Sequence, residues 1–555
     1  MRHGVWPYLL LAAACGLLFF WRLGATPLMG FDEGVYAECS REMLASGDYV
    51  VPTCNGGPFF DKPPVGYWLQ AASMRVFGVN SFAARLPSAI EGLVLVGLVV
   101  LLGTRLFSRR AGLLAGFALA SSILAAGLAR MAILDAAFTL AITASLGAFL
   151  LAYLGFWPRW SYLVFWSAMG LSVMVKGPAG AVLILATVIA FLLIRGRFFA
   201  SLRMTWPAVG IVVFLAVALP WYVLIQQRSG GDFLREFLIH QNLQRALGQD
   251  FQHNMPFYFY VPIFLVGFFP WSAFVPAALF LTRKPRPHPN PLPQERGKGE
   301  DAAVIFMAVW VGVVFVVFSI LRSKLPAYIF PIYPPSALLV GLLWARAMES
   351  GELASLRRSA FAAVLVACAI GGAMMVVPSR LHEPIPGLSA ALLPMGLSLL
   401  VGCAGGYVLL VLKRPMPAFI ALACGMAGVV TSAVSLGLPI AARTNAAPAM
   451  NIAHVIARYE QPAFAFRLSP PMPQLGFYAG RPVVRADTSS SLPSATAFLV
   501  VAQEGRREGL PPGGKVEARI GPYVLLSFAR PTSSILPLPI TTPTATSIAC
   551  ISARF

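Results

Sequence analysis

The chain has 555 residues, of which 58% are hydrophobic and 12% are charged, and its formal net charge is +20. Together with a mean hydropathy of +0.74, this composition excludes a soluble globular protein, because so few charged residues could not cover its surface. The excess of Lys and Arg does not indicate nucleic-acid binding either, because these residues lie in short segments between apolar runs and form no long basic face.

Apolar runs of about 20 residues, the length that crosses the hydrocarbon core of a bilayer, recur along the chain. The first run covers residues 5–23 and lacks a small-residue cleavage site, so we expect a retained helix rather than a signal peptide. The other runs lie at 84–106, 112–129, 136–155, 161–175, 178–194, 206–225, 258–282, 302–321, 327–345, 360–378, 391–412 and 417–441. This pattern predicts an α-helical polytopic membrane protein with about thirteen transmembrane helices.

The distribution of Lys and Arg predicts the orientation of these helices, because cytoplasmic loops collect positive charge. The basic loops are 105–110, 195–203, 283–298, 346–358 and 413–414. All of them fall on the cytoplasmic side when the N-terminus is placed there. The extracytoplasmic segments are then 24–83, 226–257, 322–326 and the region from about 442 onward.

The first extracytoplasmic loop, residues 24–83, is unusually acidic. It contains six of the 22 acidic residues in its part up to Asp61, namely Asp32, Glu33, Glu38, Glu42, Asp48 and Asp61. Helical periodicity predicts two amphipathic helices on the membrane surface, over 33–46 and about 65–77. Cys39 and Cys54 share this loop and could pair in an oxidising compartment, although two free thiols are the favoured interpretation.

The remaining extramembrane segments differ in composition. Residues 232–247 have the pattern of another surface helix, and the Pro-rich stretch 283–300 is predicted to be a disordered cytoplasmic insert. Between 446 and 530 the sequence NIAHVIARYE predicts a helix, while AFAFRL, RPVVRAD, TAFLVVAQ and YVLLSFAR predict short strands. These elements indicate a small extracytoplasmic α/β domain. Residues 531–555 are of low complexity and are predicted to be a disordered tail.

Ionisable residues gather where the spans reach the outer side. They are Asp32, Glu33, Asp61, Lys62, Arg130, Asp135, Lys176, His240, Arg245, Arg322 and Lys324. Taken singly, each has a structural explanation, such as helix capping, a surface ion pair or snorkelling of a long side chain. Cations on the outer side are nevertheless expected where an anionic lipid head group is held. Together these groups suit a reaction on a phosphate-bearing lipid, in which cations hold the phosphate and a carboxylate orients or deprotonates a hydroxyl nucleophile.

Five segments carry a resemblance to a known family. They are FDEGVYAECSREMLASGDYVVPTCNGGPFFDKPPVGYW, RMAILDA, VKGP, FLIHQNLQR and RSKLPAYIFPIYP, in this order. With them the chain resembles the bacterial lipid A 4-amino-4-deoxy-L-arabinose transferases and their relatives in the protein O-mannosyltransferase superfamily, which are GT-C membrane glycosyltransferases. The resemblance covers 1–445, the expected transmembrane glycosyltransferase domain, and more loosely the domain that follows.

This resemblance implies a multi-pass enzyme of the bacterial inner membrane with a cytoplasmic N-terminus and a periplasmic C-terminal domain. Such an enzyme moves a sugar from a polyprenyl (undecaprenyl) phosphate carrier to lipid A or another envelope acceptor on the periplasmic face. Polyprenyl phosphate is the leaving group, so fixed cations should favour the transition state. A single in-line displacement would invert the anomeric carbon.

The resemblance also assigns roles to residues. Asp32 matches the catalytic acid that follows the first span, and Asp135 matches a second acid that supports the same site. Lys62 matches a phosphate-binding lysine. Its neighbour Asp61 stands where some members have a metal ligand, so a divalent ion is an open alternative and no cofactor is required. The remaining substrate-binding candidates are Glu33, His240, Arg245, Lys324 and Tyr328.

Departures from the family pattern leave the acceptor open. The usual GRYAE is GVYAE here, which places Val35 where an Arg is expected, and HEN becomes HQN at 240–242. The runner-up function is transfer to Ser or Thr of a protein. From another class, a secondary transporter or lipid flippase would need ionisable groups near the bilayer midplane. The spans are almost free of such groups, with Glu91 as the main exception.

Overall fold

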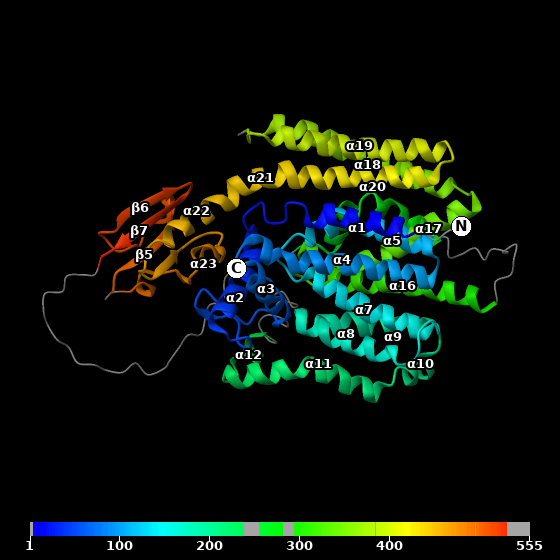
Figure 1. Ribbon diagram of the computed structural model, residues 1–555, viewed down its shortest axis with the longest axis horizontal. Coiled ribbons are helices and arrows are strands. Elements are labelled where there is room, and N and C mark those ends of the chain that lie inside the picture. Colours follow the sequence, from blue (N-terminus) through cyan, green and yellow to red (C-terminus); the bar gives the residue numbers. More distant parts are fainter. Residues whose placement is uncertain (1–3, 238–254, 281–293, 383, 494–495, 530–555) are drawn as a thin grey trace.

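The computed structural model describes residues 4–237, 255–280, 294–382, 384–493 and 496–529. Most of them form helices that run side by side, with a small β-sheet beyond one end of the bundle (Figure 1). The predicted tail at 531–555 lies outside these residues. The predicted disordered insert at 283–300 needs a correction, because its last part, from Gln294, is the start of a long helix.

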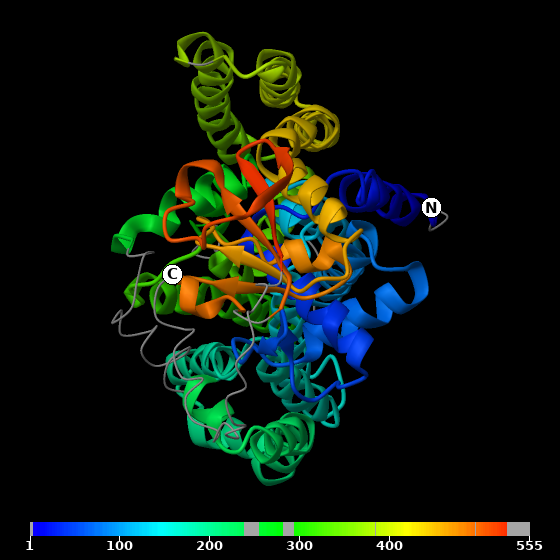
Figure 2. The same ribbon diagram turned by 90° about the vertical axis from the view of Figure 1, so that its left-hand side faces the viewer.

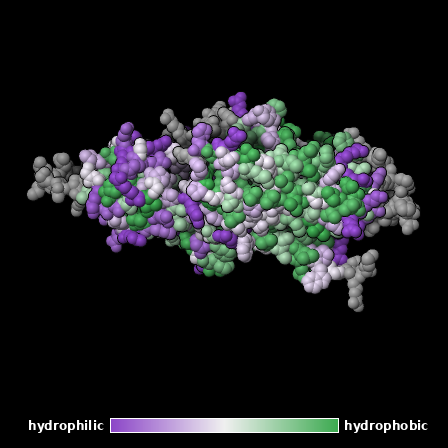
Figure 3. Space-filling view, turned by 90° about the horizontal axis from the view of Figure 1, so that it is seen from above, coloured by the Kyte–Doolittle hydropathy of each residue, from purple (hydrophilic) through white to green (hydrophobic). Residues whose placement is uncertain are grey.

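Among the described residues, eight helices are long and apolar enough to cross a membrane, accompanied by three shorter apolar helices. The long ones are α4 (Ser81–Leu106), α7 (Asp135–Tyr153), α11 (Pro207–Arg228), α16 (Gln294–Ile320), α17 (Tyr333–Ser350), α18 (Ala354–Arg380), α19 (Leu388–Val411) and α20 (Pro415–Ser432). The shorter ones are α1 (Trp6–Cys15) with its continuation η1 (Gly16–Phe20), α8 (Ser161–Lys176) and α9 (Ala179–Ile194). The face in Figure 3 is hydrophobic over the middle of the molecule and more hydrophilic at both ends. The predicted polytopic helical membrane protein is confirmed.

Two of the predicted spans are not single straight helices. The run 112–129 is divided into α5 (Arg109–Ala120) and α6 (Ile123–Leu128). Ser121 and Ser122 stand at the break, and their hydroxyl groups donate to preceding backbone carbonyls at 2.7 and 2.8 Å, which competes with helix continuation. The run 258–282 bends by 106° between α14 (Tyr260–Gly267) and the helical segment Trp271–Phe280, at Pro270, which has no N–H to continue a helix.

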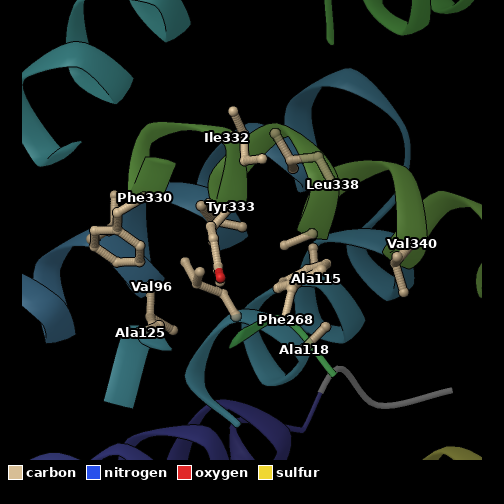
Figure 4. Close-up of a cluster of buried hydrophobic side chains, with 14 of the residues drawn as sticks. Val96, Ala115, Ala118, Ala125, Phe268, Phe330, Ile332, Tyr333, Leu338 and Val340 are labelled. Carbon is tan, nitrogen blue, oxygen red and sulfur yellow. The ribbon is translucent and has the colours of Figure 1, made fainter. Parts of the chain in front are cut away.

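Small residues allow close packing inside the bundle. At Gly112 a Cβ atom would lie 2.5 Å from the carbonyl oxygen of Val100, and at Gly341 it would overlap the carbonyl oxygen of Ala111. The backbones of α4, α5 and α17 therefore approach each other directly, as is typical of helices packed within a membrane. Figure 4 shows part of the resulting core, where Phe268, Phe330 and Tyr333 lie among aliphatic side chains. The yellow-green helices α18 and α19 project to one side of the bundle (Figure 2), although buried residues of both belong to the same core.

Residues 24–83, the predicted extracytoplasmic loop, form the end of the bundle next to the sheet. It contains α2 (Gly30–Ser46), a hairpin of β1 (Thr53–Cys54) and β2 (Gly57–Pro58), and α3 (Val65–Phe77). Both predicted helices are present. The prediction that α2 lies on a surface is wrong, because every residue from Glu33 to Met43 is buried, including four charged ones. Cys39 and Cys54 are free thiols.

The C-terminal domain is continuous with the last membrane helix. The helical segment Pro415–Ile456 runs from α20 through α21 (Leu438–Ala441) to α22 (Ala447–Ile456) without a linker, so the predicted domain boundary at 445 lies inside it. The five-stranded sheet has the order β4-β3-β5-β7-β6, with β4, β3 and β5 parallel and β7 and β6 antiparallel to their neighbours. The strands are β3 (Ala463–Phe466), β4 (Val483–Ala486), β5 (Phe498–Gln503), β6 (Lys515–Ile520) and β7 (Tyr523–Phe528). Helix α23 (Gln474–Ala479) and strand β6 were not predicted.

Candidate active site

Asp32 lies in the first turn of α2, and its carboxylate makes no hydrogen bond or ion pair with the residues that the structure describes. Four charged side chains lie close enough to influence it, namely Lys62, Asp61, Asp135 and Lys176. Although Asp32 is exposed, the protein around it displaces much of the bulk water, and this raises the pKa of its carboxyl group. The two ammonium groups oppose the rise, and the neighbouring carboxylates reinforce it.

Asp61 and Lys62 form the first acid–lysine pair beside Asp32. The Lys62 Nζ atom lies 2.7 Å from Asp61 Oδ2, and the two side chains are 16% and 17% exposed. The pair follows the β1–β2 hairpin and precedes two prolines that lead into α3, which restricts the backbone around it. The Lys62 ammonium group also donates to the backbone carbonyl oxygen of Asp61 at 3.2 Å, which fixes this cation near Asp32.

Asp135 and Lys176 form a second pair, from two different helices. Asp135 begins α7, where the helix dipole favours a carboxylate, and Lys176 ends α8, where the dipole favours a cation. The Lys176 Nζ atom lies 2.6 Å from Asp135 Oδ1 and 5.5 Å from the ring centre of Tyr328. Both charged side chains are about one-tenth exposed. The site therefore places the exposed carboxylate of Asp32 near two partly buried acid–lysine pairs.

Glu33, the residue after Asp32, has a different role from the predicted one. Its side chain is 1% exposed, and both carboxylate oxygens accept hydrogen bonds of 2.8 Å from the guanidinium group of Arg85. The same oxygens accept the backbone N–H groups of Met29 and Ala132, also at 2.8 Å. With every favourable acceptor position used inside the protein, Glu33 is not available to a substrate. We therefore correct its assignment from substrate binding to structural support.

The structure places the other predicted substrate-binding residues differently from one another. Lys324 is 3% exposed, and its ammonium group donates to the backbone carbonyls of Met255 and Leu321, so it anchors this loop. Its role as a phosphate ligand stays a prediction. Tyr328 is half-buried and lies against Lys176, next to the site. His240 and Arg245 lie outside the described residues.

Comparison with known proteins places this arrangement in a family. The family model described as dolichyl-phosphate-mannose-protein mannosyltransferase matches residues 61–224. An undecaprenyl phosphate-alpha-4-amino-4-deoxy-L-arabinose arabinosyl transferase of Pseudomonas fluorescens is 30% identical over 429 residues, which are 76% of this chain and 70% of the relative. The chain belongs to this arabinosyl transferase family. A second arabinosyl transferase, from Pseudomonas aeruginosa, is 33% identical over 361 residues, 64% of this chain. The chain spans 62% of the length of that relative.

Solved structures of this arabinosyl transferase family have the same fold. The crystal structure of ArnT from Cupriavidus metallidurans bound to undecaprenyl phosphate superimposes with a TM-score of 0.79 and 25% sequence identity, and covers 94% of this chain and 98% of its own. The archaeal oligosaccharyltransferase AglB of Archaeoglobus fulgidus shares the fold alone, with a TM-score of 0.50 and 13% identity. The segment that matches the family model, 61–224, contains both acid–lysine pairs of the site.

Two basic residues near the site have positions that the sequence alone did not predict. Lys176 was interpreted as a snorkelling side chain, yet it contributes one of the two cations near Asp32. Its position directly before Gly-Pro, at the end of an apolar run, was the available signal. Arg130 was considered together with Asp135, but its guanidinium group instead donates to the backbone carbonyls of Leu18 and Trp21, where the first span ends.

Asp61, the candidate metal ligand, has a cationic partner. It is paired directly with the ammonium group of Lys62, and Asp135 is paired with that of Lys176. Within the described ranges, no group of three or more His, Cys, Asp or Glu side chains could hold a metal ion. A divalent ion at Asp61 therefore stays a prediction, without a ligand set among these residues.

Proposed function

We propose that this protein is a glycosyltransferase that moves a sugar from an undecaprenyl-phosphate carrier to a lipid acceptor on the periplasmic face of the inner membrane. The observation that carries the proposal is the exposed carboxylate of Asp32 near two acid–lysine pairs. Membership of the arabinosyl transferase family, and the likeness to a transferase crystallised with undecaprenyl phosphate, support the same chemistry.

In this proposal the two lysines act on the leaving group. Negative charge on the carrier phosphate increases as the bond to the sugar breaks, and Lys62 and Lys176 would be fixed cations close to that charge. Charges held in place before the reaction stabilise the transition state more than the ground state. The partner acids Asp61 and Asp135 keep both ammonium groups in position.

Asp32 would orient the acceptor hydroxyl or remove its proton. A carboxylate with an ordinary pKa is a weak base at neutral pH, and the raised pKa of Asp32 brings its basicity closer to the working pH. The acceptor oxygen would attack the anomeric carbon as the phosphate leaves on the opposite side, in a single displacement with inversion. A product with retained stereochemistry would contradict this sequence of steps.

For the substrates, we propose an aminopentose donor, 4-amino-4-deoxy-L-arabinose on undecaprenyl phosphate, and lipid A as the acceptor. The names of the curated relatives support the donor. Lipid A as the acceptor rests on the family resemblance of the sequence. The second candidate is transfer to Ser or Thr of a protein, which the description of the matched family model favours.

The placement of charged loops supports a periplasmic site. Helix α2 and the sheet lie at one end of the molecule, and the N-terminus lies at the other (Figure 1). The basic segments 105–110, 195–203 and 346–358 follow or precede helix ends on the side of the N-terminus. Because cytoplasmic loops collect Lys and Arg, we propose that the N-terminus is cytoplasmic and the C-terminal domain periplasmic.

Sugar transfer by the purified protein in detergent tests the proposal. Donors would be undecaprenyl-phosphate aminoarabinose and a mannosyl counterpart, and acceptors lipid A and a Ser/Thr-rich peptide. We expect wild type to label lipid A and Asp32→Asn to abolish transfer. The control is Asp487→Asn, which changes an exposed acid on the C-terminal domain. Labelling of the peptide instead would favour the second candidate. Equal activity of Asp32→Asn and wild type would refute the role of Asp32.

A further inference from the structure

The C-terminal domain is docked on the helix that carries Asp32. Helix α23 lies against α2 (Figure 1). The approach is close, because a Cβ atom at Gly34 of α2 would lie 2.7 Å from Gln474 Oε1 and 3.0 Å from the backbone nitrogen of Gln474. At Gly476 of α23, a Cβ atom would overlap the side-chain oxygens of Glu38 and Asn55. Neither face could accept an added methyl group without movement.

A buried ionic network reinforces this interface. Glu38 is fully buried and accepts two hydrogen bonds of 2.7 Å from Arg41. Arg41 also donates to the backbone carbonyl of Gly480, just beyond α23, at 3.2 Å. Because a buried charge is costly unless it is paired and hydrogen-bonded, the docked domain uses a donor of Arg41 that the pair with Glu38 leaves over, and separation of the two parts would break this hydrogen bond.

The same domain also holds both segments that flank Asp32 in the sequence. The Tyr478 hydroxyl accepts the backbone N–H of Leu28 at 2.6 Å and lies 2.9 Å from the hydroxyl of Ser81. On the other side, Asn55 at the tip of the β1–β2 hairpin accepts the backbone N–H of Val483 at 3.3 Å. The hairpin is also attached to α2, since Gly56 N–H donates to Glu42 at 2.9 Å.

We propose that the C-terminal domain is a positioning element of the catalytic site, which holds α2 and the β1–β2 hairpin so that Asp32 faces the Asp61–Lys62 pair. The inference rests on the proposed transferase activity. None of the four charged side chains that influence Asp32 belongs to this domain, and its contacts reach α2 at Gly34 and Glu38, which follow Asp32 in the helix. Since a helix moves as a unit, displacement of α23 would carry Asp32 with it.

Two variants test the proposal through different contacts. Gly476→Ala adds a methyl group against Glu38 and Asn55, and Tyr478→Phe removes the hydroxyl bonded to Leu28 without adding volume. The matched control is Gly505→Ala in the same domain, where nothing lies within 4 Å of the added atom. Small misplacements far from the chemistry can cost about a hundredfold in rate. For Gly476→Ala we expect kcat per folded molecule to fall about tenfold to a hundredfold, with the KM for the donor changed less than about threefold.

Hydrogen–deuterium exchange gives a readout that does not depend on activity. We expect faster exchange at residues 30–36 and 53–62 in Gly476→Ala and Tyr478→Phe than in wild type and Gly505→Ala. Lower thermal stability with unchanged kcat and unchanged exchange in both variants would overturn the inference, since the interface would then serve stability alone. If wild type transfers no sugar, the proposed function fails, and the exchange rates still decide whether the domain positions α2.

Discussion

The buried ion pair between Glu33 and Arg85 should contribute strongly to the stability of the end of the bundle that lies next to the sheet. The side chains are 1% and 4% exposed, and their atoms lie 2.8 Å apart. Arg85 also donates to the backbone carbonyls of Leu23, Thr26 and Pro27. Replacement of either partner, as in Glu33→Gln or Arg85→Met, leaves the other charge buried without its counter-charge.

The size of the effect follows from this burial. Removing one partner of a buried ion pair costs about 3–5 kcal/mol of folding free energy. In the double variant neither charge remains, so its loss should fall short of the sum of the two single losses by about 1–3 kcal/mol, the usual coupling between groups in contact. We therefore expect a large loss of folding free energy in each single variant, and a loss in the double variant that is clearly smaller than their sum.

Denaturant unfolding of the purified protein in detergent, followed by tryptophan fluorescence, measures these free energies. The exposed pair of Arg228 and Asp48, with side chains 55% and 39% exposed, is the matched control and should contribute at most about 1 kcal/mol. Single losses below about 1 kcal/mol at Glu33 and Arg85, or strict additivity in the double variant, would show that the pair does not hold this region together.

Three further predictions concern the site and the core. Asp61→Asn removes a negative charge that raises the pKa of Asp32, so the acid limb of the pH profile of kcat/KM should move to lower pH; a shift to higher pH would contradict the assignment of Asp32 as the base. Lys176→Gln should lower kcat about tenfold or more, because a fixed cation near the leaving phosphate is lost, and steady-state transfer at saturating donor would show no change if Lys176 only snorkels. Gly341→Ala should destabilise the bundle by about 1–3 kcal/mol in thermal unfolding, because its methyl group meets the carbonyl of Ala111, whereas Gly97→Ala on α4 meets no atom within 4 Å and should be neutral.

The sequence predicted the class of fold and the main acids well, because both depend on strong local signals. Long apolar runs can be satisfied only as membrane-spanning helices, and an acid directly after the first run is conspicuous in such a chain. It could not separate Asp32 from Glu33. The two are neighbours of the same chemical type, and only the position of Arg85, 52 residues later, decides which one is paired.

Other errors arose from tertiary context. Helix α2 has apolar and charged residues that suggested a surface position, but Glu38, Arg41 and Glu42 satisfy one another and the C-terminal domain inside the protein. Strand β6 was missed although its charged residues Lys515, Glu517 and Arg519 alternate with apolar ones, which is a strand pattern. It lies at the edge of the sheet, and none of its residues is buried, so it lacks the apolar run by which the other strands were predicted. The break at Ser121 and Ser122 depends on hydroxyl contacts that a hydropathy average does not register.

The unbroken helical segment Pro415–Ile456 has a geometric consequence. Its 42 residues at a rise of about 1.5 Å each give a rod of roughly 60 Å, about twice the thickness of the hydrocarbon core of a bilayer. About half of this rod must therefore project beyond the lipid tails, and it ends in the sheet domain. The length of this helical segment therefore sets how far the sheet domain stands from the bilayer.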